Sequence, residues 1–218
     1  MKEIFPGVFK KGKKLFTLNS TPGISFYGER LLKINNKEYR EWNPRRSKLA
    51  AALLNGLRYF PFRKNSTVLY LGSAEGTTVS HLSDICTEGY IFGVDISAKC
   101  MRKFLMLCNL RKNIIPILAD ANRPITYINK VPKVDALFQD ISQKNQTEIF
   151  IKNVDLFLKE SCLGLIAIKA RSIDVTRKPK KVIKEEISKL SEKFKILQKM
   201  SLFPYEKDHG FVVVKKEI

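Results

Sequence analysis

The chain has 218 residues, enough for one sizeable domain and a small appendage, and its hydrophobic content of 44% is ordinary for a globular core. No apolar run approaches the roughly 18 residues of a membrane-spanning helix, and residues 1–6 lack the apolar stretch of a signal peptide, so we expect a cytoplasmic protein without a membrane partner. Lys and Arg number 40 against 21 Asp and Glu, a net charge of +19. This excess indicates nucleic acid as the partner, although a solvated lysine-rich surface would have the same composition.

The cysteines and histidines argue against a disulfide framework and against a structural zinc site. No two cysteines have C-x-x-C spacing, and most lie in apolar stretches, so we interpret them as reduced core residues. Two histidines add too few ligands for zinc. The residues concerned are Cys86, Cys100, Cys108, Cys162, His81 and His209.

Residues 1–41 differ in pattern from the rest and predict a small antiparallel β subdomain before a main domain at 42–218. It is too small to bury much apolar surface alone, so we expect it to pack on the main domain or on a partner. Turn residues separate or follow its strand-like segments, which are 15–18, 24–27 and 31–34.

A helix is predicted to begin at Asn43-Pro44, because Asn43 can cap it and Pro44 suits its first turn. Arg45 and Arg46 would then lie in that first turn, where the helix dipole disfavours cations. We therefore expect either an acidic neighbour or an anionic ligand beside them.

The chain is organised around residues 66–95. The apolar run 67–71 predicts a strand that leads into a glycine turn and a helix, and 90–94 predicts a second strand that ends at Asp95. Gly72 would let the backbone approach a ligand at the helix N-terminus, and Asp95, 95 − 72 = 23 positions later, could hold ribose hydroxyls. Ala74 replaces the middle glycine of the dinucleotide fingerprint, which favours a nucleoside without phosphates, such as S-adenosylmethionine.

Strands and helices alternate strictly after Asp95, which predicts an α/β fold with a parallel, doubly wound sheet. The predicted strands are 114–119, 134–139, 163–168, 194–203 and 210–215. The predicted helices are 98–110, 125–129, 146–158 and 179–193.

Charged residues follow four consecutive predicted strands, at Asp95, Asp120, Asp140 and Lys169. One acid could simply cap a helix, but four charged residues at one edge of the sheet indicate a ligand site. Asp140 and Lys169 would lie side by side if their strands pair. Such a pair can be structural, or it can position a lysine that must lose a proton.

Five blocks across nearly the whole chain resemble the archaeal fibrillarin family. They are YGER at 27–30, WNPRRSKLAAA at 42–52, GTTVSH at 76–81, AIKARSID at 167–174 and PYEKDH at 204–209. Fibrillarins are S-adenosylmethionine-dependent 2′-O-methyltransferases of rRNA and tRNA that act within box C/D guide RNA particles. The resemblance therefore implies a seven-stranded Rossmann-like methyltransferase domain after a small β subdomain, with a guide RNA, a Nop5-type scaffold protein and the L7Ae protein as partners.

The resemblance also implies residue roles, and no metal. The catalytic set would fall on Lys48, Asp140, Lys169 and His209. Besides the Gly72 turn, cofactor contacts would fall on Thr77, Thr78, Asp95, Ile96, Asp120, Ala121, Asp140, Ile141, Ser142 and Gln143. This sequence departs from the family in having Asp95 where glutamate is usual and Glu75 where a small residue is usual.

Two other function classes compete with this interpretation. A nucleotide-linked oxidoreductase would share the fold, but the missing middle glycine and the charged residues at 140 and 169 count against it. A non-catalytic RNA-binding scaffold with the same fold would share the charge. Base methylation usually needs an Asp/Asn-Pro-Pro-aromatic motif, and residues 140–143 do not form one.

Overall fold

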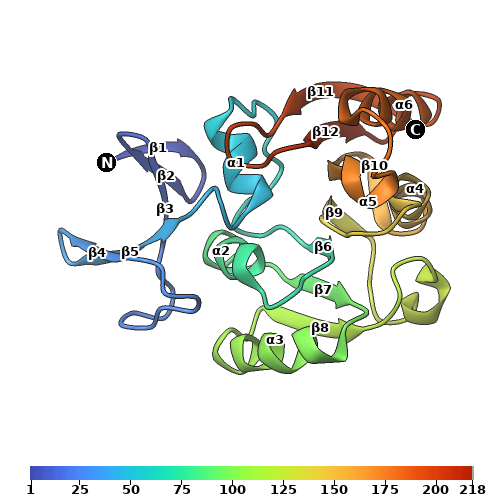
Figure 1. Cartoon of the computed structure of the whole chain (residues 1–218). Helices are drawn as coiled ribbons and strands as arrows, with labels where there is room; N and C mark the ends of the chain where they lie inside the picture. The colour runs from blue at the N-terminus through green and yellow to red at the C-terminus, as the bar shows by residue number, and fades with distance from the viewer. Residues whose placement is uncertain (218) are drawn as a thin grey trace.

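The computed structural model describes residues 1–217, which form two β-sheets and their connecting helices (Figure 1). The N-terminal sheet is antiparallel with strand order β1-β2-β3-β5-β4. Its strands are β1 (Lys2–Phe5), β2 (Val8–Lys11), β3 (Lys14–Leu18), β4 (Leu31–Ile34) and β5 (Lys37–Trp42). The small antiparallel subdomain is therefore confirmed, while the domain boundary after residue 41 stays a prediction.

The second sheet has seven strands in the order β11-β12-β10-β9-β6-β7-β8. The strands are β6 (Val68–Leu71), β7 (Ile91–Asp95), β8 (Ile114–Leu118), β9 (Val134–Gln139), β10 (Leu158–Lys169), β11 (Lys195–Ser201) and β12 (His209–Lys215). β12 is antiparallel to both of its neighbours, so the prediction of an all-parallel sheet is wrong at this strand. The reason is the short connection 202–208, which suffices for a hairpin but not for a parallel crossover.

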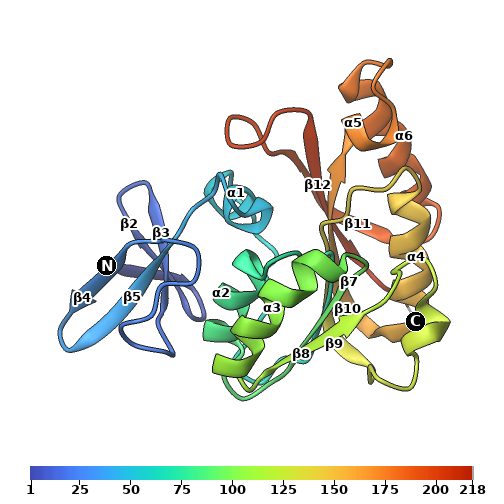
Figure 2. The same cartoon turned by 60° about the horizontal axis from the view of Figure 1, so that its bottom comes forward.

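Helices cover both faces of the large sheet, which confirms the doubly wound architecture (Figure 2). α1 to α3 pack on one face around Tyr70 and Phe138, and α4 and α6 pack on the other around Leu69 and Leu137. The helices are α1 (Lys48–Leu54), α2 (Thr77–Ile85), α3 (Ala98–Leu110), the 3₁₀ turn η1 (Pro124–Tyr127), α4 (Gln146–Phe157), the short α5 (Ala170–Ile173) and α6 (Pro179–Ser191). Within residues 1–217, no helix is both long and apolar enough to cross a bilayer.

The first helix begins at Lys48 and not at Asn43. Ser47 is its N-cap and accepts a hydrogen bond from the Ala50 N–H at 3.3 Å. Asn43 instead organises a tight turn, because its side chain accepts from the Arg45 N–H at 2.9 Å. Arg45 and Arg46 therefore precede the helix and escape its dipole.

Other differences lie in the N-terminal sheet and among the cysteines. Segment 24–27 is a loop and not a strand, because the Phe26 and Tyr27 N–H groups donate to the Glu29 carboxylate. Strands β1, β2 and β5 were not predicted; β5 buries charged Glu38 and Arg40 and so lacks the expected apolar pattern. All four cysteines are free, but only Cys86 is buried and the others are half-buried.

A buried charged cluster joins the two sheets. The Asp84 carboxylate on α2 accepts from Arg40 of β5 at 2.9 Å and also pairs with Arg111 after α3. Arg40 binds Glu29 at 2.6 Å as well. Two cations thus face two anions, and Thr17 and Ser20 donate further hydrogen bonds to Asp84. Burial alone would raise the pKa of Glu29, but Arg40 and backbone N–H groups hold it below its usual value.

His81 extends this cluster as a neutral, fully buried ring. It stacks on Trp42 at 4.9 Å between ring centroids. Nδ1 lies 2.7 Å from the Thr17 hydroxyl, which donates to Asp84, so Nδ1 must carry the hydrogen. Nε2 is then free to accept from the Tyr27 hydroxyl at 2.6 Å. Burial, with Arg40 and Arg111 nearby, holds the pKa of His81 well below its usual value.

We predict that His81 makes the fold acid-sensitive below about pH 6.5. The unfolded histidine has a pKa near 6.5 and the folded one a lower pKa, so its stabilising contribution is complete above pH 6.5 and is lost as pH falls. The loss is at most about 1.4 kcal/mol per pH unit. Denaturant unfolding between pH 7 and 5 should show a shallower pH dependence in His81→Gln than in wild type. A wild-type slope in His81→Gln would contradict this prediction.

Candidate functional site

The order of the strands indicates where a ligand would bind, namely at the carboxyl ends of the parallel strands of the large sheet. The chain builds β6 first, adds β7 and β8 on one side, and then adds β9 and β10 on the other. The parallel strands β6 and β9 therefore form the switch point, and ligands of such sheets bind outside the carboxyl ends of the strands there.

A cavity of about 400 Å³ lies at this edge, within the size range of small-molecule sites. Eight residues expected to contact a cofactor line it: Gly72, Asp95, Ile96, Ala121, Asp140, Ile141, Ser142 and Gln143. Six further residues complete the lining: Ala74, Val94, Ser97, Cys100, Ala119 and Lys169. The cavity thus combines an apolar wall with carboxylates and one lysine.

The glycine turn after β6 brings two backbones into close approach. Gly72 has φ +85°, and a Cβ at this position would lie 2.4 Å from the Asp140 carbonyl oxygen. Gly76, the N-cap of α2, has φ +94°, and its Cβ would lie 2.5 Å from Leu107 of α3. Glycine is therefore required at both ends of the turn.

Asp95 holds the same turn from the end of β7. Its Oδ2 accepts from the Ala74 N–H at 2.7 Å, and its Oδ1 accepts from the Ser97 N–H at 2.8 Å. Each carboxylate oxygen keeps a second acceptor position. Asp95 can therefore shape the turn and still accept from a ligand in the cavity.

Asp140 lies between two lysines from different elements. Its Oδ1 is 2.8 Å from Lys169 Nζ at the end of β10, which confirms the predicted pairing, and its Oδ2 is 3.4 Å from Lys48 Nζ at the start of α1. Lys169 also donates to the Ser142 hydroxyl at 2.9 Å, and Lys48 lies 3.7 Å from Glu206. Both carboxylate oxygens of Asp140 therefore face a lysine ammonium, and Oδ1 is itself buried.

His209 lies beside this cluster without contacting it. It is directly opposite Lys169 in the antiparallel β10–β12 pair, which places both side chains on the same face of the sheet. Its Nδ1 lies 2.6 Å from the Lys207 carbonyl oxygen, and the described residues contain no hydrogen bond from Nε2. Nε2 thus remains available to a ligand.

Three of the predicted cofactor residues do not line the cavity. Thr77 begins α2, and the buried Thr78 hydroxyl donates to Ser47 at 2.9 Å, tying α2 to α1. The Asp120 carboxylate accepts from the Asn122 N–H at 2.9 Å, although Asp120 stands between the lining residues Ala119 and Ala121.

Glu206 belongs to one of the blocks that resemble the family, but nothing in the sequence was a reason to assign it a role in the site. It comes from the β11–β12 connection and meets Lys48 only because the chain folds back across the sheet, so no local spacing could have indicated it. Glu75, which stands where the family usually has a small residue, does not line the cavity. Its carboxylate pairs with Lys103 at 2.6 Å instead.

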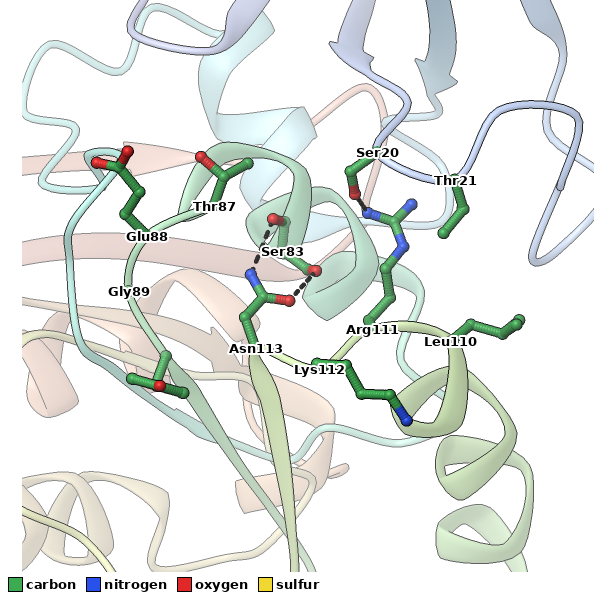
Figure 3. Close-up of a pocket in the computed structure, with 11 residues that line it drawn as sticks. Ser20, Thr21, Ser83, Thr87, Glu88, Gly89, Leu110, Arg111, Lys112 and Asn113 are labelled. Atoms are coloured by element: carbon green, nitrogen blue, oxygen red, sulfur yellow. Dashed lines mark hydrogen bonds between the residues drawn. The ribbon is translucent and has the colours of Figure 1, made fainter.

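A second cavity, of about 380 Å³, lies where β7 and β8 begin, at the opposite edge of the sheet (Figure 3). Ser83 and Asn113 hydrogen bond across it at 2.7 Å. Arg111 points toward Ser20 of the small subdomain, whereas the neighbouring Lys112 extends away from that contact. None of the predicted site residues lines this cavity.

Comparison with known proteins identifies relatives over nearly the full chain. The fibrillarin family model matches residues 1–218. The fibrillarin-like rRNA/tRNA 2′-O-methyltransferase of Methanothermobacter thermautotrophicus is 50% identical over 213 residues, which covers 97% of this chain and 95% of the relative.

Two solved structures are similarly close. Aeropyrum pernix fibrillarin, in complex with natively bound S-adenosyl-L-methionine, is 44% identical with a TM-score of 0.86, covering 92% of this chain and 88% of that one. A fibrillarin in complex with Nop5p is 46% identical with a TM-score of 0.92, covering 99% of this chain and 100% of that one. Since the family model and these relatives extend over almost every residue, the chain belongs to the fibrillarin family.

Proposed function

We propose that this protein is an S-adenosylmethionine-dependent RNA 2′-O-methyltransferase. The single observation that carries the proposal is Asp140, which lies between Lys48 and Lys169 and opens onto the cavity at the carboxyl edge of the sheet. The substrates would be rRNA and tRNA, as in the names of the relatives. The protein would act in the cytoplasm as the catalytic subunit of a box C/D particle, with a guide RNA, a Nop5-type scaffold and the L7Ae protein.

The residues around the cavity fit S-adenosylmethionine. The Gly72 turn leaves room for backbone approach, and Asp95 has free acceptor positions suited to ribose hydroxyls. Apolar Ile96 and Ile141, with the small Ala121, suit a nucleobase. The Asp140 carboxylate, which lines the cavity, suits a positively charged ligand. Thr77, Thr78 and Asp120 stay proposed contacts at the edge of this set.

Catalysis of methyl transfer to a ribose requires help with one proton. S-adenosylmethionine, when bound, supplies a methyl group that its positive sulfur already activates. The 2′-hydroxyl is a very weak acid, so a positioned base and nearby positive charge both favour its attack. We assign the base to Lys169, held by Asp140 and Ser142. The Lys169 ammonium first passes a proton to the Asp140 carboxylate, and the neutral amine then takes the 2′ proton as the ribose oxygen attacks the methyl group. Lys48 and His209 orient the hydroxyl or relay the proton.

Asp95→Asn should weaken S-adenosylmethionine binding by about 1–1.5 kcal/mol, because a charge-assisted hydrogen bond is replaced by a neutral one of about half its strength. Isothermal titration calorimetry measures the change. Asp135→Asn is the matched control, since Asp135 lies at the start of β9, at the opposite edge, and should leave affinity unchanged. Equal affinities of Asp95→Asn and wild type would remove Asp95 from the cofactor site.

Lys169→Ala and Asp140→Asn should each lower the single-turnover methylation rate at saturating S-adenosylmethionine by about 10²-fold or more in assembled particles, with RNA binding intact. Lys159 and Asp135 form another lysine–aspartate pair at 2.6 Å, remote from the cavity lining, and Lys159→Ala should keep the wild-type rate. Near-normal rates in both site variants would show that the pair is structural. An inactive wild-type particle that still binds RNA would instead favour the non-catalytic scaffold.

A further inference from the structure

Two arginines stand on a rigid turn next to the site lysine. Asn43 fixes this turn, since its side chain accepts from the Arg45 N–H at 2.9 Å and its carbonyl accepts from the Arg46 N–H at 3.1 Å. Arg46 is two residues before Lys48, so their Cα atoms are at most about 7 Å apart. The turn thus fixes the backbone of Arg45 and Arg46 close to the backbone of Lys48, whose side chain pairs with Asp140.

The Arg46 guanidinium is oriented by Tyr27. Its Nη1 donates to the Tyr27 carbonyl at 2.9 Å, and its carbon lies 4.9 Å from the centroid of the Tyr27 ring. Tyr27 is itself fixed, because its hydroxyl bonds to buried His81. Arginine has five N–H donors, and stacking leaves its edge free, so most donors of this exposed side chain still face solvent.

The positive charges at this place have no acidic partners. Within residues 1–217, the side chains of Arg30, Arg45 and Arg46 form no ion pair, although Arg30 and Arg46 line a cavity of about 230 Å³ together with Glu29 and Glu41. Both acids are already engaged, Glu29 with buried Arg40 and Glu41 with Lys14 at 2.9 Å. Of the two alternatives expected beside Arg45 and Arg46, the acidic neighbour is therefore absent among residues 1–217, and the anionic ligand remains.

We propose that Arg30, Arg45 and Arg46 bind phosphate groups of the RNA strand that presents its ribose to Asp140. An exposed guanidinium with a fixed plane matches the paired oxygens of a phosphate. The net charge of +19 favours an RNA backbone as the anion. This inference rests on the proposed function, because the position of the ribose at Asp140 places the neighbouring phosphates near the turn.

The test combines binding and kinetics on assembled particles with a guide RNA and its target. Each of Arg45→Ala and Arg46→Ala should lower the slope of log affinity against log salt by about 0.7 to 0.9, the share of one phosphate contact. The RNA concentration for half-maximal methylation should rise, while the rate at saturating RNA should stay near that of wild type. Arg46→Lys keeps the charge and loses the paired geometry, so it should restore the salt slope and only part of the affinity.

Lys112→Ala is the matched control, because it removes one exposed positive charge at the opposite edge of the large sheet. It should leave the half-maximal RNA concentration unchanged. If the arginine variants equal this control while the wild-type particle methylates its target, the phosphate site is wrong and the proposed function stands. If they lose scaffold binding with an unchanged salt slope, the surface binds protein and the inference is also wrong. A wild-type particle without methylation would contradict the proposed function itself.

Discussion

The burial of Asp84 is the constraint on which the arrangement of the two sheets depends. Its side chain is fully buried, and Arg40 and Arg111 each pair with one of its two carboxylate oxygens. Removing either arginine would leave an uncompensated charge in the interior, which is among the most destabilising changes that a single substitution can make. The N-terminal sheet is thus tied to α2, and the N-terminus of α2 is the turn that borders the cavity. The small subdomain therefore supports the position of the site, although none of its own residues lines the main cavity.

The site itself is assembled by strand register. Parallel pairing of β9 with its neighbours brings Asp140 next to both Gly72 and Lys169, and the close approach of Asp140 to Gly72 joins the turn to the charged cluster. Lys48 arrives from a different direction, on a helix whose N-cap Ser47 is bound by Thr78. The cavity and the catalytic candidates are consequently parts of one packed unit, and a displacement of α2 would move both.

Most of the large sheet and its edge could be predicted from sequence, because apolar strands that end in a charged residue leave a strong local pattern. Asp95, Asp140 and Lys169 were found in this way, while Lys48 and His209 required the resemblance to the family. The local pattern gave wrong or incomplete predictions where contacts between residues distant in sequence determine the structure. β5 buries Arg40 and Glu38 because each binds a partner distant in sequence. Ser47 caps the first helix through the Ala50 N–H, and it also accepts from Thr78 of α2, a contact that no local pattern indicates. Glu206 was missed for the same reason, since it meets Lys48 only in the folded chain.

The balanced set of charges around Asp84 also has a consequence for heat tolerance. The free energy of hydrating a charged group becomes less favourable as temperature rises, so the cost of burying these two cations and two anions falls on heating. Their mutual attraction persists inside the protein, where water does not screen it. The buried ion pairs around Asp84 should therefore stabilise the protein at high temperature more than exposed ion pairs would. On heating, the contact between the two sheets should persist after weaker surface contacts have been lost.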